Sequence, residues 1–312
     1  MDSSENDLDM TRPFRVLELY CGIGGCSAAL PRGVEVVAAI DINTTALEVY
    51  RWNFQHPTLP LNLDFVSPRD LDRQAADLWW LSPPCQPFTV RGLQRDTEDR
   101  RTLSFLRLID CLSECLPTFL ALENVPGFRG SGTHTRLRSV LDELGYEVQE
   151  IVLCPTELGI PNRRERLFLV AGLAPLRPLR RPRPAPSPLE AFLDRQPPAA
   201  LWIDRDLLNR YREALSIVNP RQPTAVASCF TSAYGRSPVR SGSYLDTMSG
   251  ARRFSPEEIL RLLGFPPDFT LPPDLTMRKA WSLVGNSLSV PAVRHVLSAI
   301  PRLANDVSAY SR

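Results

Sequence analysis

One cysteine in this sequence stands where a reactive thiol could be held in a fixed direction. Cys85 lies in Leu-Ser-Pro-Pro-Cys-Gln-Pro-Phe-Thr (81–89), directly after the apolar run 78–81, which predicts a short buried strand. Proline fixes φ and keeps the preceding residue out of the helical region, so we expect a stiff, extended loop. A thiol becomes a useful nucleophile when its thiolate is favoured and its position is fixed. Taken alone, Cys85 could equally be a small buried apolar residue.

A carboxylate and two arginines further along the chain have the chemistry to assist such a nucleophile. Glu123 opens Glu-Asn-Val-Pro-Gly-Phe, and Arg164 and Arg166 lie in Gly-Ile-Pro-Asn-Arg-Arg-Glu-Arg. Two residues apart where a strand begins, the arginines could point to one side together. An acid whose pKa is raised by burial can donate a proton, and guanidinium groups can stabilise developing negative charge. Taken singly, Glu123 could be a solvated acid and the arginines an ion-paired turn.

The elements that carry these residues alternate between strands and helices. Apolar runs predict strands at 14–19, 35–40, 78–81, 118–122, 146–154 and 166–171, and helical periodicity occupies 44–54, 101–116 and 135–144. This alternation predicts an α/β fold with a doubly wound, mostly parallel sheet. Ligands bind such sheets outside the carboxyl ends of the strands, and both Cys85 and Glu123 fall at such ends.

A glycine-rich turn and an acid indicate a nucleotide-like ligand at the same edge. Tyr20-Cys21-Gly22-Ile23-Gly24-Gly25 follows the first predicted strand, and glycine lets a backbone turn tightly and approach a ligand closely. The pattern is not G-x-G-x-x-G, so by itself it is weak. Asp41 ends the second strand about 20 residues later, where such folds hold ribose hydroxyls. Asp41 could also cap the helix that begins near Thr44.

The composition is that of an ordinary soluble protein. The 312 residues carry a net charge of +1, with 43% hydrophobic and 23% charged residues, so nucleic-acid binding would need a local basic patch. No apolar run approaches the roughly 20 residues of a transmembrane helix. Seven cysteines without a C-x-x-C pair and three scattered histidines lack the spacing of a zinc site. We therefore expect reduced thiols, a cytoplasmic location and no metal.

Three motifs occurring in order give these residues a common interpretation. Ser-Pro-Pro-Cys-Gln-Pro-Phe-Thr, Glu-Asn-Val-Pro-Gly-Phe and Gly-Ile-Pro-Asn-Arg-Arg-Glu-Arg resemble those of the cytosine-5 methyltransferases, most closely the Dnmt2 branch, over about residues 14 to 300. The resemblance implies a class I, Rossmann-like methyltransferase. In it Cys85 would bond to cytosine C6, Glu123 would contact N3, and Arg164 and Arg166 would donate to O2. The arginine after the nucleophile is displaced by one position, to Arg91.

The same resemblance implies S-adenosylmethionine as the methyl donor. Its site would comprise Tyr20, Gly22, Gly24, Asp41, Asp64, Pro84 and Asn286. Asp64 is expected near the adenine. Asn286, in Gly-Asn-Ser, would return from the C-terminal part of the chain to complete the pocket.

Changes in composition divide the chain into five segments. Residues 1–12 are expected to be a disordered tail, 13–173 the catalytic domain, 174–188 a Pro/Arg-rich linker or wrapping segment, 189–252 a small target-recognition domain, and 253–312 a return that completes the catalytic domain. The last segment opens on a capping box at Ser255-Pro256-Glu257-Glu258.

The tripeptide Cys-Phe-Thr at 229–231 favours RNA over DNA as the substrate. It is typical of the Dnmt2 branch, which modifies tRNA, and implies cytosine 38 of the tRNA-Asp anticodon loop, an unpaired base that is easily extruded. Cys229, Phe230, Thr231 and Tyr234 are therefore expected to bind the substrate, with Phe230 and Tyr234 stacking on bases. Phe230 could instead be core, and Cys229 could be a second reactive thiol.

Two other functions remain open from the sequence. The first is a DNA cytosine-5 methyltransferase, and the second is a catalytically idle nucleic-acid-binding protein that keeps the fold. The presence of Cys85, Glu123, Arg164 and Arg166 together argues against an idle protein. We expect a monomer.

Overall fold

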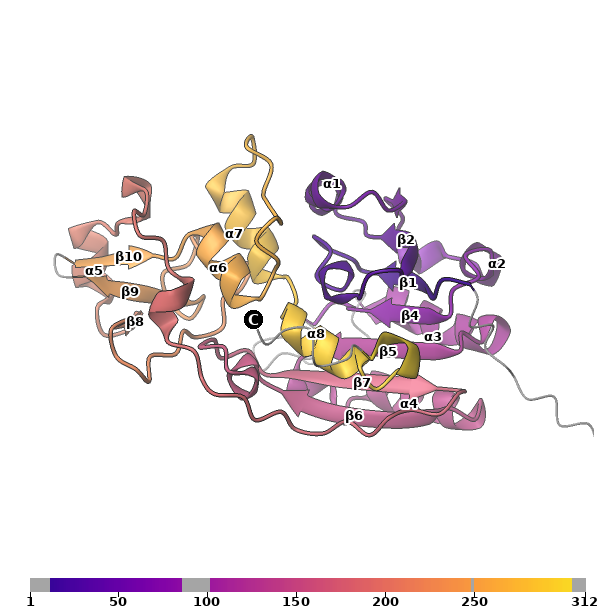
Figure 1. Cartoon of the computed structure of the whole chain (residues 1–312). Coiled ribbons are helices and arrows are strands. Elements are labelled where there is room, and N and C mark those ends of the chain that lie inside the picture. Colours follow the sequence, from indigo (N-terminus) through magenta and orange to yellow (C-terminus); the bar gives the residue numbers. More distant parts are fainter. Residues whose placement is uncertain (1–11, 86–101, 248–249, 305–312) are drawn as a thin grey trace, which may run out of the picture.

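A seven-stranded sheet organises the larger part of the chain (Figure 1). The computed structural model describes residues 12–85, 102–247 and 250–304. The sheet comprises β1 (Arg15–Leu19), β2 (Glu35–Ile40), β3 (Thr58–Leu59), β4 (Leu78–Leu81), β5 (Phe119–Asn124), β6 (Glu147–Leu153) and β7 (Arg166–Gly172). The strand order is β3-β2-β1-β4-β5-β7-β6. The strands β1 to β5 are parallel to one another, and β7 lies antiparallel between β5 and β6. The predicted α/β fold with a mostly parallel sheet is confirmed.

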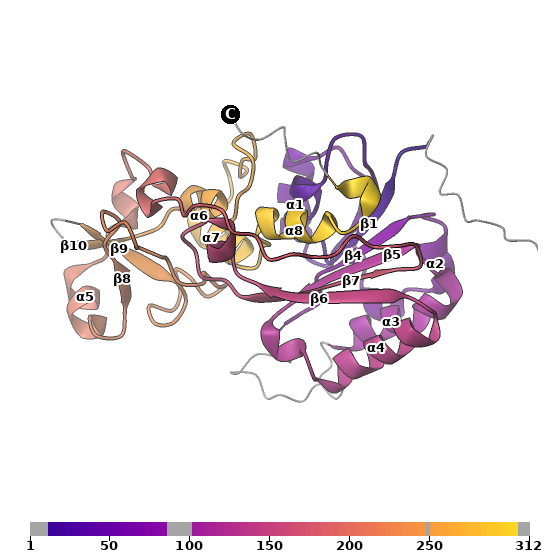
Figure 2. The same cartoon turned by 60° about the horizontal axis from the view of Figure 1, so that its bottom comes forward.

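Helices cover both faces of this sheet (Figure 2). They are α1 (Thr44–Asn53), α2 (Pro68–Asp72), α3 (Leu103–Cys115), α4 (Gly132–Glu143) and, from the C-terminal part, α8 (Val290–Leu297). Alternate strand residues point to opposite faces. Trp79 and Leu120 therefore pack with α3 and α4, whereas Trp80 and Ala121 pack with α8. The C-terminal part of the chain thus covers one face of a sheet built by the N-terminal part.

A second, smaller sheet lies beyond helices α6 (Pro256–Leu262) and α7 (Met277–Gly285) (Figure 1). It contains β8 (Ser216–Val218), β9 (Ser243–Thr247) and β10 (Gly250–Arg253), and the short helix α5 (Arg205–Tyr211) precedes it. The predicted capping box is confirmed, because Ser255 and Glu258 bond each other's backbone N–H groups at the start of α6. Glu258 also forms a buried ion pair with Arg252 at 2.7 Å. This pair joins the small sheet to α6.

The Pro/Arg-rich residues 174–188 form neither helix nor strand, as their composition predicts. They run as an extended strap alongside β6 and β7 toward the small sheet (Figures 1 and 2). The tail at 1–11 lies outside the described residues, as do Gln86 to Thr89 of the nucleophile motif and the displaced Arg91.

A buried carboxylate in β1 lies directly before the glycine turn. Oε2 of Glu18 accepts hydrogen bonds from Ser27 Oγ at 2.5 Å and Tyr50 Oη at 3.1 Å. Tyr50 Oη in turn lies 3.0 Å from Nδ1 of the half-buried His56. Burial raises the pKa of Glu18 to about 7, although the Ser27 and Tyr50 hydrogen bonds lower it. Glu18 therefore takes up a proton near neutral pH.

We expect Glu18→Gln to flatten the pH dependence of folding stability. Because the folded pKa of about 7 exceeds the ordinary 4.5, the stabilising contribution of Glu18 is complete below about pH 4.5 and is lost as the pH rises through 7. The loss is about 3 kcal/mol. Glutamine does not titrate, so the variant should lose about 3 kcal/mol less of its unfolding free energy over this range. Urea denaturation at several pH values measures this, and parallel profiles would contradict it.

Candidate active site

Cys85 lies just beyond the carboxyl end of β4, the strand between β1 and β5. The chain reaches it through Pro83, which is buried, and Pro84, which is exposed. Asn124 Nδ2, at the end of β5, donates to the Pro83 carbonyl at 3.5 Å, and Ser82 N donates to the carbonyl of the last residue of β1 at 3.3 Å. The loop is therefore tied to both neighbouring strands, and Cys85 remains half-buried at its end.

The charges around Cys85 come from the ends of two other strands. Burial raises the pKa of the Cys85 thiol and the negative charge of Glu123 raises it further, while Arg166 and Arg164 act in the opposite direction. The resting sulfur is consequently a thiol at neutral pH, and it must lose a proton before it can attack. The predicted acid and arginines thus lie close enough to Cys85 to act on its ionisation.

Glu123 and Arg166 form an ion pair on adjacent antiparallel strands. Arg166 Nε lies 2.9 Å from Glu123 Oε1, and the two side chains are only 17% and 11% exposed. Arg166 also donates to the carbonyl of Glu165 at 2.7 Å. A carboxylate and a cationic donor therefore lie side by side at the end of the sheet, beside Cys85.

The structure corrects the prediction that both arginines face the substrate. Arg164 is 5% exposed, and its guanidinium donates to three backbone carbonyls: those of Phe230 at 3.0 Å, Gly285 at 3.3 Å and Ser287 at 2.5 Å. A terminal nitrogen occupied by these acceptors is not free to bind a base. Arg164 instead connects the Cys-Phe-Thr segment and the Gly-Asn-Ser turn to the residues just before β7 through these hydrogen bonds.

The glycine turn has the shape of a ligand cradle. Gly22 adopts φ +53°, and no atom lies within 4 Å of the position where a Cβ would stand. Gly24 adopts φ +93°, but a Cβ there would collide with Phe54 and Tyr50. Gly22 therefore leaves open space for a ligand, whereas Gly24 is required by the packing of the turn on α1.

Two carboxylates lie beside this turn. Asp41 Oδ2 accepts from Gly22 N at 2.9 Å, and its Oδ1 accepts from Asn43 N at 2.8 Å. Burial raises the pKa of Asp41, against the lowering effect of these backbone donors. The charges of Asp64 and Asp41 both act on Tyr20, so these three predicted residues lie together. Asp41 does not cap α1: Asn43 does, by accepting from Ala46 N.

Sequence reasoning missed two apolar side chains at this site. Ile42 and Phe65 directly follow Asp41 and Asp64, and they are 67% and 82% exposed. Large apolar side chains left in water next to polar groups are typical of ligand-binding surfaces. In the sequence, their position immediately after the two acids was the signal that could have identified them as part of the site. A cradle at Gly22, two carboxylates and two apolar side chains fit a ligand with a ribose and a flat base.

Asn286 lies in the turn that follows α7. It is exposed, and Gly285 before it lies against the Thr231 backbone. A side chain on Gly285 would collide with that backbone, so only glycine allows the close approach. The Gly-Asn-Ser turn and the Cys-Phe-Thr segment are thus packed together.

The predicted base-stacking residues belong to the core. Phe230 is 2% exposed and Tyr234 is fully buried. Their rings meet edge-to-face at 5.1 Å, and Tyr234 also contacts Trp281 at 5.6 Å. Tyr234 Oη donates to the Ser243 carbonyl at 2.7 Å. The prediction that these two rings stack on bases is therefore wrong, because both are used to pack the small sheet on α7.

Cys229, by contrast, lies at the candidate catalytic residues. Its Sγ is 3.3 Å from Arg164 Nη1 and 3.8 Å from Arg166 Nη2. Burial opposes ionisation of this thiol, but the two guanidinium groups outweigh it and lower the pKa of Cys229 below its ordinary value. Thr231 is half-buried, and its N–H donates to the Ser241 carbonyl. Of the four predicted substrate residues, Cys229 and Thr231 remain candidates.

Comparison with known proteins assigns this architecture to a family. The profile of the C-5 cytosine-specific DNA methylases matches residues 14–196 and 208–302. The chain belongs to the C-5 cytosine methyltransferase family. A Bos taurus protein named tRNA (cytosine(38)-C(5))-methyltransferase is 33% identical over 92% of this chain and 99% of its own length.

Solved structures of family members have the same fold. The Entamoeba histolytica methyltransferase EhMeth superposes with a TM-score of 0.85 at 26% identity, covering 92% of this chain and 98% of that one. The S. pombe Dnmt2 methyltransferase gives 0.82 at 28% identity, covering 92% and 97%. Within the family the chain lies in the Dnmt2 branch, as its motifs predicted. The family's enzymes depend on S-adenosylmethionine.

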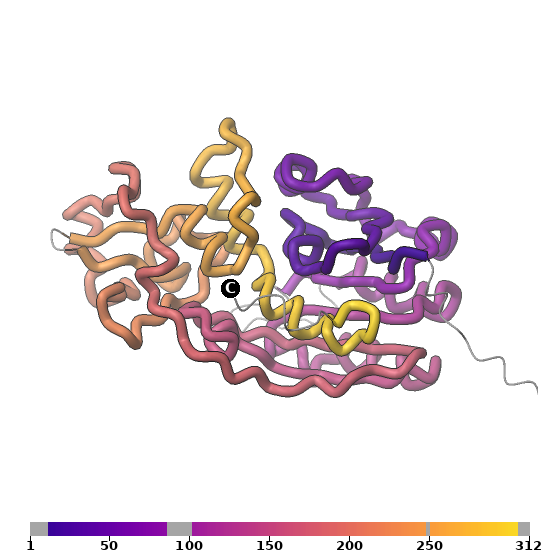
Figure 3. Tube along the Cα trace, viewed as in Figure 1, coloured from indigo at the N-terminus to yellow at the C-terminus, as the bar shows by residue number. Residues whose placement is uncertain are grey.

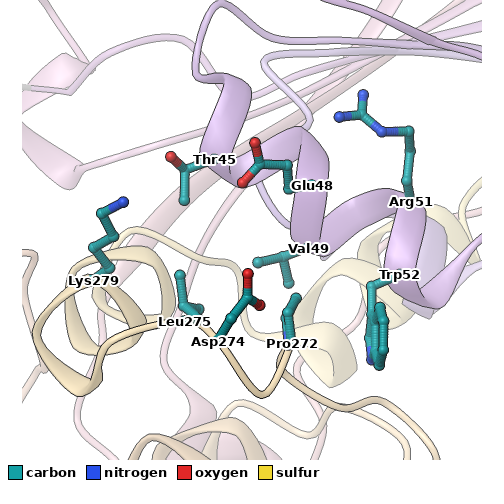
Figure 4. A pocket seen from close by; sticks show the side chains of 9 residues that line it. All are labelled: Thr45, Glu48, Val49, Arg51, Trp52, Pro272, Asp274, Leu275 and Lys279. Atoms are coloured by element: carbon teal, nitrogen blue, oxygen red, sulfur yellow. The ribbon is translucent and has the colours of Figure 1, made fainter.

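A pocket of about 410 Å³ between α1 and the segment before α7 is separate from Cys85 and Glu123 (Figure 4). Neither Cys85 nor Glu123 is among its lining residues, and its rim carries both signs of charge, including Glu48, Asp274 and Lys279. Its position therefore does not suit a cytosine bound at the nucleophile.

Two further observations concern the described part of the chain. No helix there is long and apolar enough to cross a membrane. Nor does that part contain a group of three or more His, Cys, Asp or Glu side chains placed to hold a metal ion.

Proposed function

We propose that this chain methylates C5 of a cytosine in tRNA through a transient bond between Cys85 and C6. The observation that carries the proposal is the convergence of Cys85, Glu123 and Arg166 from the ends of β4, β5 and β7. The printed names of the relatives support tRNA, and specifically cytosine 38, as the target. We further propose tRNA-Asp as the substrate.

The residues of the chain would divide the chemistry between them. Cys85 loses its proton to water and its thiolate adds to C6, and Glu123, once protonated, gives a proton to N3 so that negative charge does not build up on the ring. Arg166 stabilises O2. Gly22, Asp41 and Asp64 would hold S-adenosylmethionine, which would supply the methyl group for C5 and leave as S-adenosylhomocysteine. Loss of the C5 proton to water then breaks the bond between Cys85 and C6, and the return of the N3 proton to Glu123 restores the enzyme.

Methyl transfer to defined substrates tests this proposal. The protein is incubated with labelled methyl donor and either tRNA-Asp, the same tRNA with uridine at position 38, or duplex DNA. We expect label only in the unaltered tRNA. The family description keeps DNA as the second candidate, and label in the duplex alone would establish it. Equal label in both tRNAs would refute position 38.

Glu123→Gln is expected to lower kcat by roughly 10²-fold or more, because general acid catalysis commonly contributes that much. The amide keeps the size of the side chain but cannot give up a proton to N3, and Arg166 loses its charged partner. Single-turnover methylation at saturating tRNA measures the effect. Glu143→Gln, on the exposed surface of α4, is the matched control and should behave as wild type. Unchanged turnover in Glu123→Gln would remove Glu123 from the mechanism.

A further inference from the structure

The Pro/Arg-rich strap (174–188) is fixed along the outside of the catalytic sheet. Its backbone N–H groups at Leu176 and Leu179 donate to the side chains of Glu147 and Gln149 on β6, at 3.4 and 2.9 Å. On its other side, Arg177 N donates to a carbonyl just after α8 at 2.7 Å. His295 Nε2, on α8 itself, donates to the Arg180 carbonyl at 2.8 Å. Hydrogen bonds to both β6 and the α8 region therefore fix the path of the strap.

The side chains of the strap repeat with a period of three. Leu176, Leu179 and Pro182 are half-buried, and the two leucines pack against the main core. Arg177, Arg180 and Arg183 follow them one position later, and all three are exposed. A polyproline II helix has three residues per turn and rises about 3.1 Å per residue. The three arginines therefore form one outward row with a spacing of roughly 9 Å.

The positive charge of this row is not neutralised by any residue that the structure describes. Arg181, which points to a different side, pairs with Glu157. Arg177, Arg180 and Arg183 form no ion pair with any residue in the described ranges. In a chain whose net charge is only +1, three adjacent unpaired arginines are a local basic patch of the kind that binds polyanions.

The row leads to the catalytic residues. At the C-terminal end of the strap, Ser187 N donates to the Gly159 carbonyl at 2.8 Å. Gly159 lies in the β6–β7 connection, which carries Arg164 and leads into β7 at Arg166 (Figure 3). Aromatic grooves that recognise proline-rich segments need the apolar side of the segment, and here that side is packed inward. Guanidinium groups pointing outward suit phosphates instead.

We propose that Arg177, Arg180 and Arg183 bind the phosphodiester backbone of the tRNA substrate outside its anticodon loop. The proposal rests on the proposed function, since it assumes that a tRNA places its target base at Cys85. Phosphate contacts of this kind contribute affinity and salt dependence without selecting a base. The row then positions the body of the RNA, while the end of the sheet performs the chemistry.

Replacing the three arginines with alanine tests the row. Removing three phosphate contacts should weaken tRNA binding about tenfold or more near 0.1 M salt, and should reduce the slope of log K against log salt by roughly 2 to 3. Turnover at saturating tRNA should stay within about twofold of wild type, because the row does not touch the reacting atoms. The triple lysine variant should recover most of the affinity, since lysine also binds phosphate.

The control removes the same charge elsewhere. Arg32, Arg69 and Arg73 are exposed and belong to other segments, the turn before β2 and the helix α2 with its C-terminal residue, and their triple alanine variant should bind tRNA as wild type does. If both triple variants had the same affinity and salt slope, the proposal would be overturned. The two proposals can also fail separately: a wild type that binds tRNA through the row but leaves it unmethylated would overturn the proposed function alone.

Discussion

Replacing Cys85 with alanine is expected to abolish methyl transfer, with a loss of roughly 10⁴-fold or more. The reason is chemical: C5 of cytosine is a poor nucleophile until a group adds to C6, and Cys85 is the thiol placed beside both Glu123 and Arg166. Alanine removes the sulfur without disturbing the loop, because the hydrogen bonds that fix it come from Ser82 and Pro83. Binding of tRNA should therefore persist while turnover disappears.

Single-turnover methylation and adduct trapping measure this effect. An RNA that carries 5-fluorocytosine at the target position has no proton to lose from C5, so wild type should remain bonded to it under denaturing conditions. Cys85→Ala should give no such adduct. Cys115→Ala, at the end of α3 with its sulfur turned to the Pro68 carbonyl, is the matched control. Wild-type turnover in Cys85→Ala would exclude the covalent mechanism.

The second large effect is expected in stability. Arg164→Met should lower the free energy of unfolding by about 3 to 5 kcal/mol, because it leaves three buried carbonyls, those of Phe230, Gly285 and Ser287, without their charged donor. Methionine has a similar length and fits the apolar surroundings, so the loss reports mainly on hydrogen bonding. Urea denaturation measures the change.

The neighbouring Arg163→Met is the control for Arg164. Arg163 is exposed, and its hydrogen bond to the Ala227 carbonyl comes from its backbone N–H, so replacement of its side chain should cost less than about 0.5 kcal/mol. Loss of turnover in Arg164→Met without loss of stability would restore Arg164 to the direct role that its motif implied. Loss of both would agree with an arginine that holds the site together.

The sequence was informative wherever function depends on a position at the end of a strand. Glu123 and Asp41 follow apolar runs directly, Cys85 follows one after Ser82-Pro83-Pro84, and parallel strands bring such ends to one edge. The prediction that Phe230 and Tyr234 stack on bases was wrong because an aromatic residue near glycine and arginine has the same local sequence pattern whether it binds a base or packs in a core. Tyr234 packs against Trp281 and Phe230 packs against Phe254, and both partners come later in the chain.

Arg164 and Arg166 show the same limit at closer range. Their spacing indicates that they share one face of a strand, but it does not reveal which partners meet that face. Arg164 donates to the carbonyls of Gly285 and Ser287, whereas Arg166 forms an ion pair with Glu123 on the adjacent strand. The partners that decide each role are distant in the sequence: those of Arg164 are 121 and 123 residues away, and Glu123 is about 40 residues from Arg166. No local pattern contains that information.

The position of α8 has a consequence for how the protein is made. Val16, Trp80 and Phe119 belong to the face of the sheet on which α8 packs, yet they are synthesised some 170 to 280 residues before Val290–Leu297. A nascent chain must keep that apolar face uncovered on the ribosome until α8 emerges, a period in which it is prone to aggregate or to bind chaperones. Folding of the catalytic sheet is therefore completed only after α8 has been synthesised.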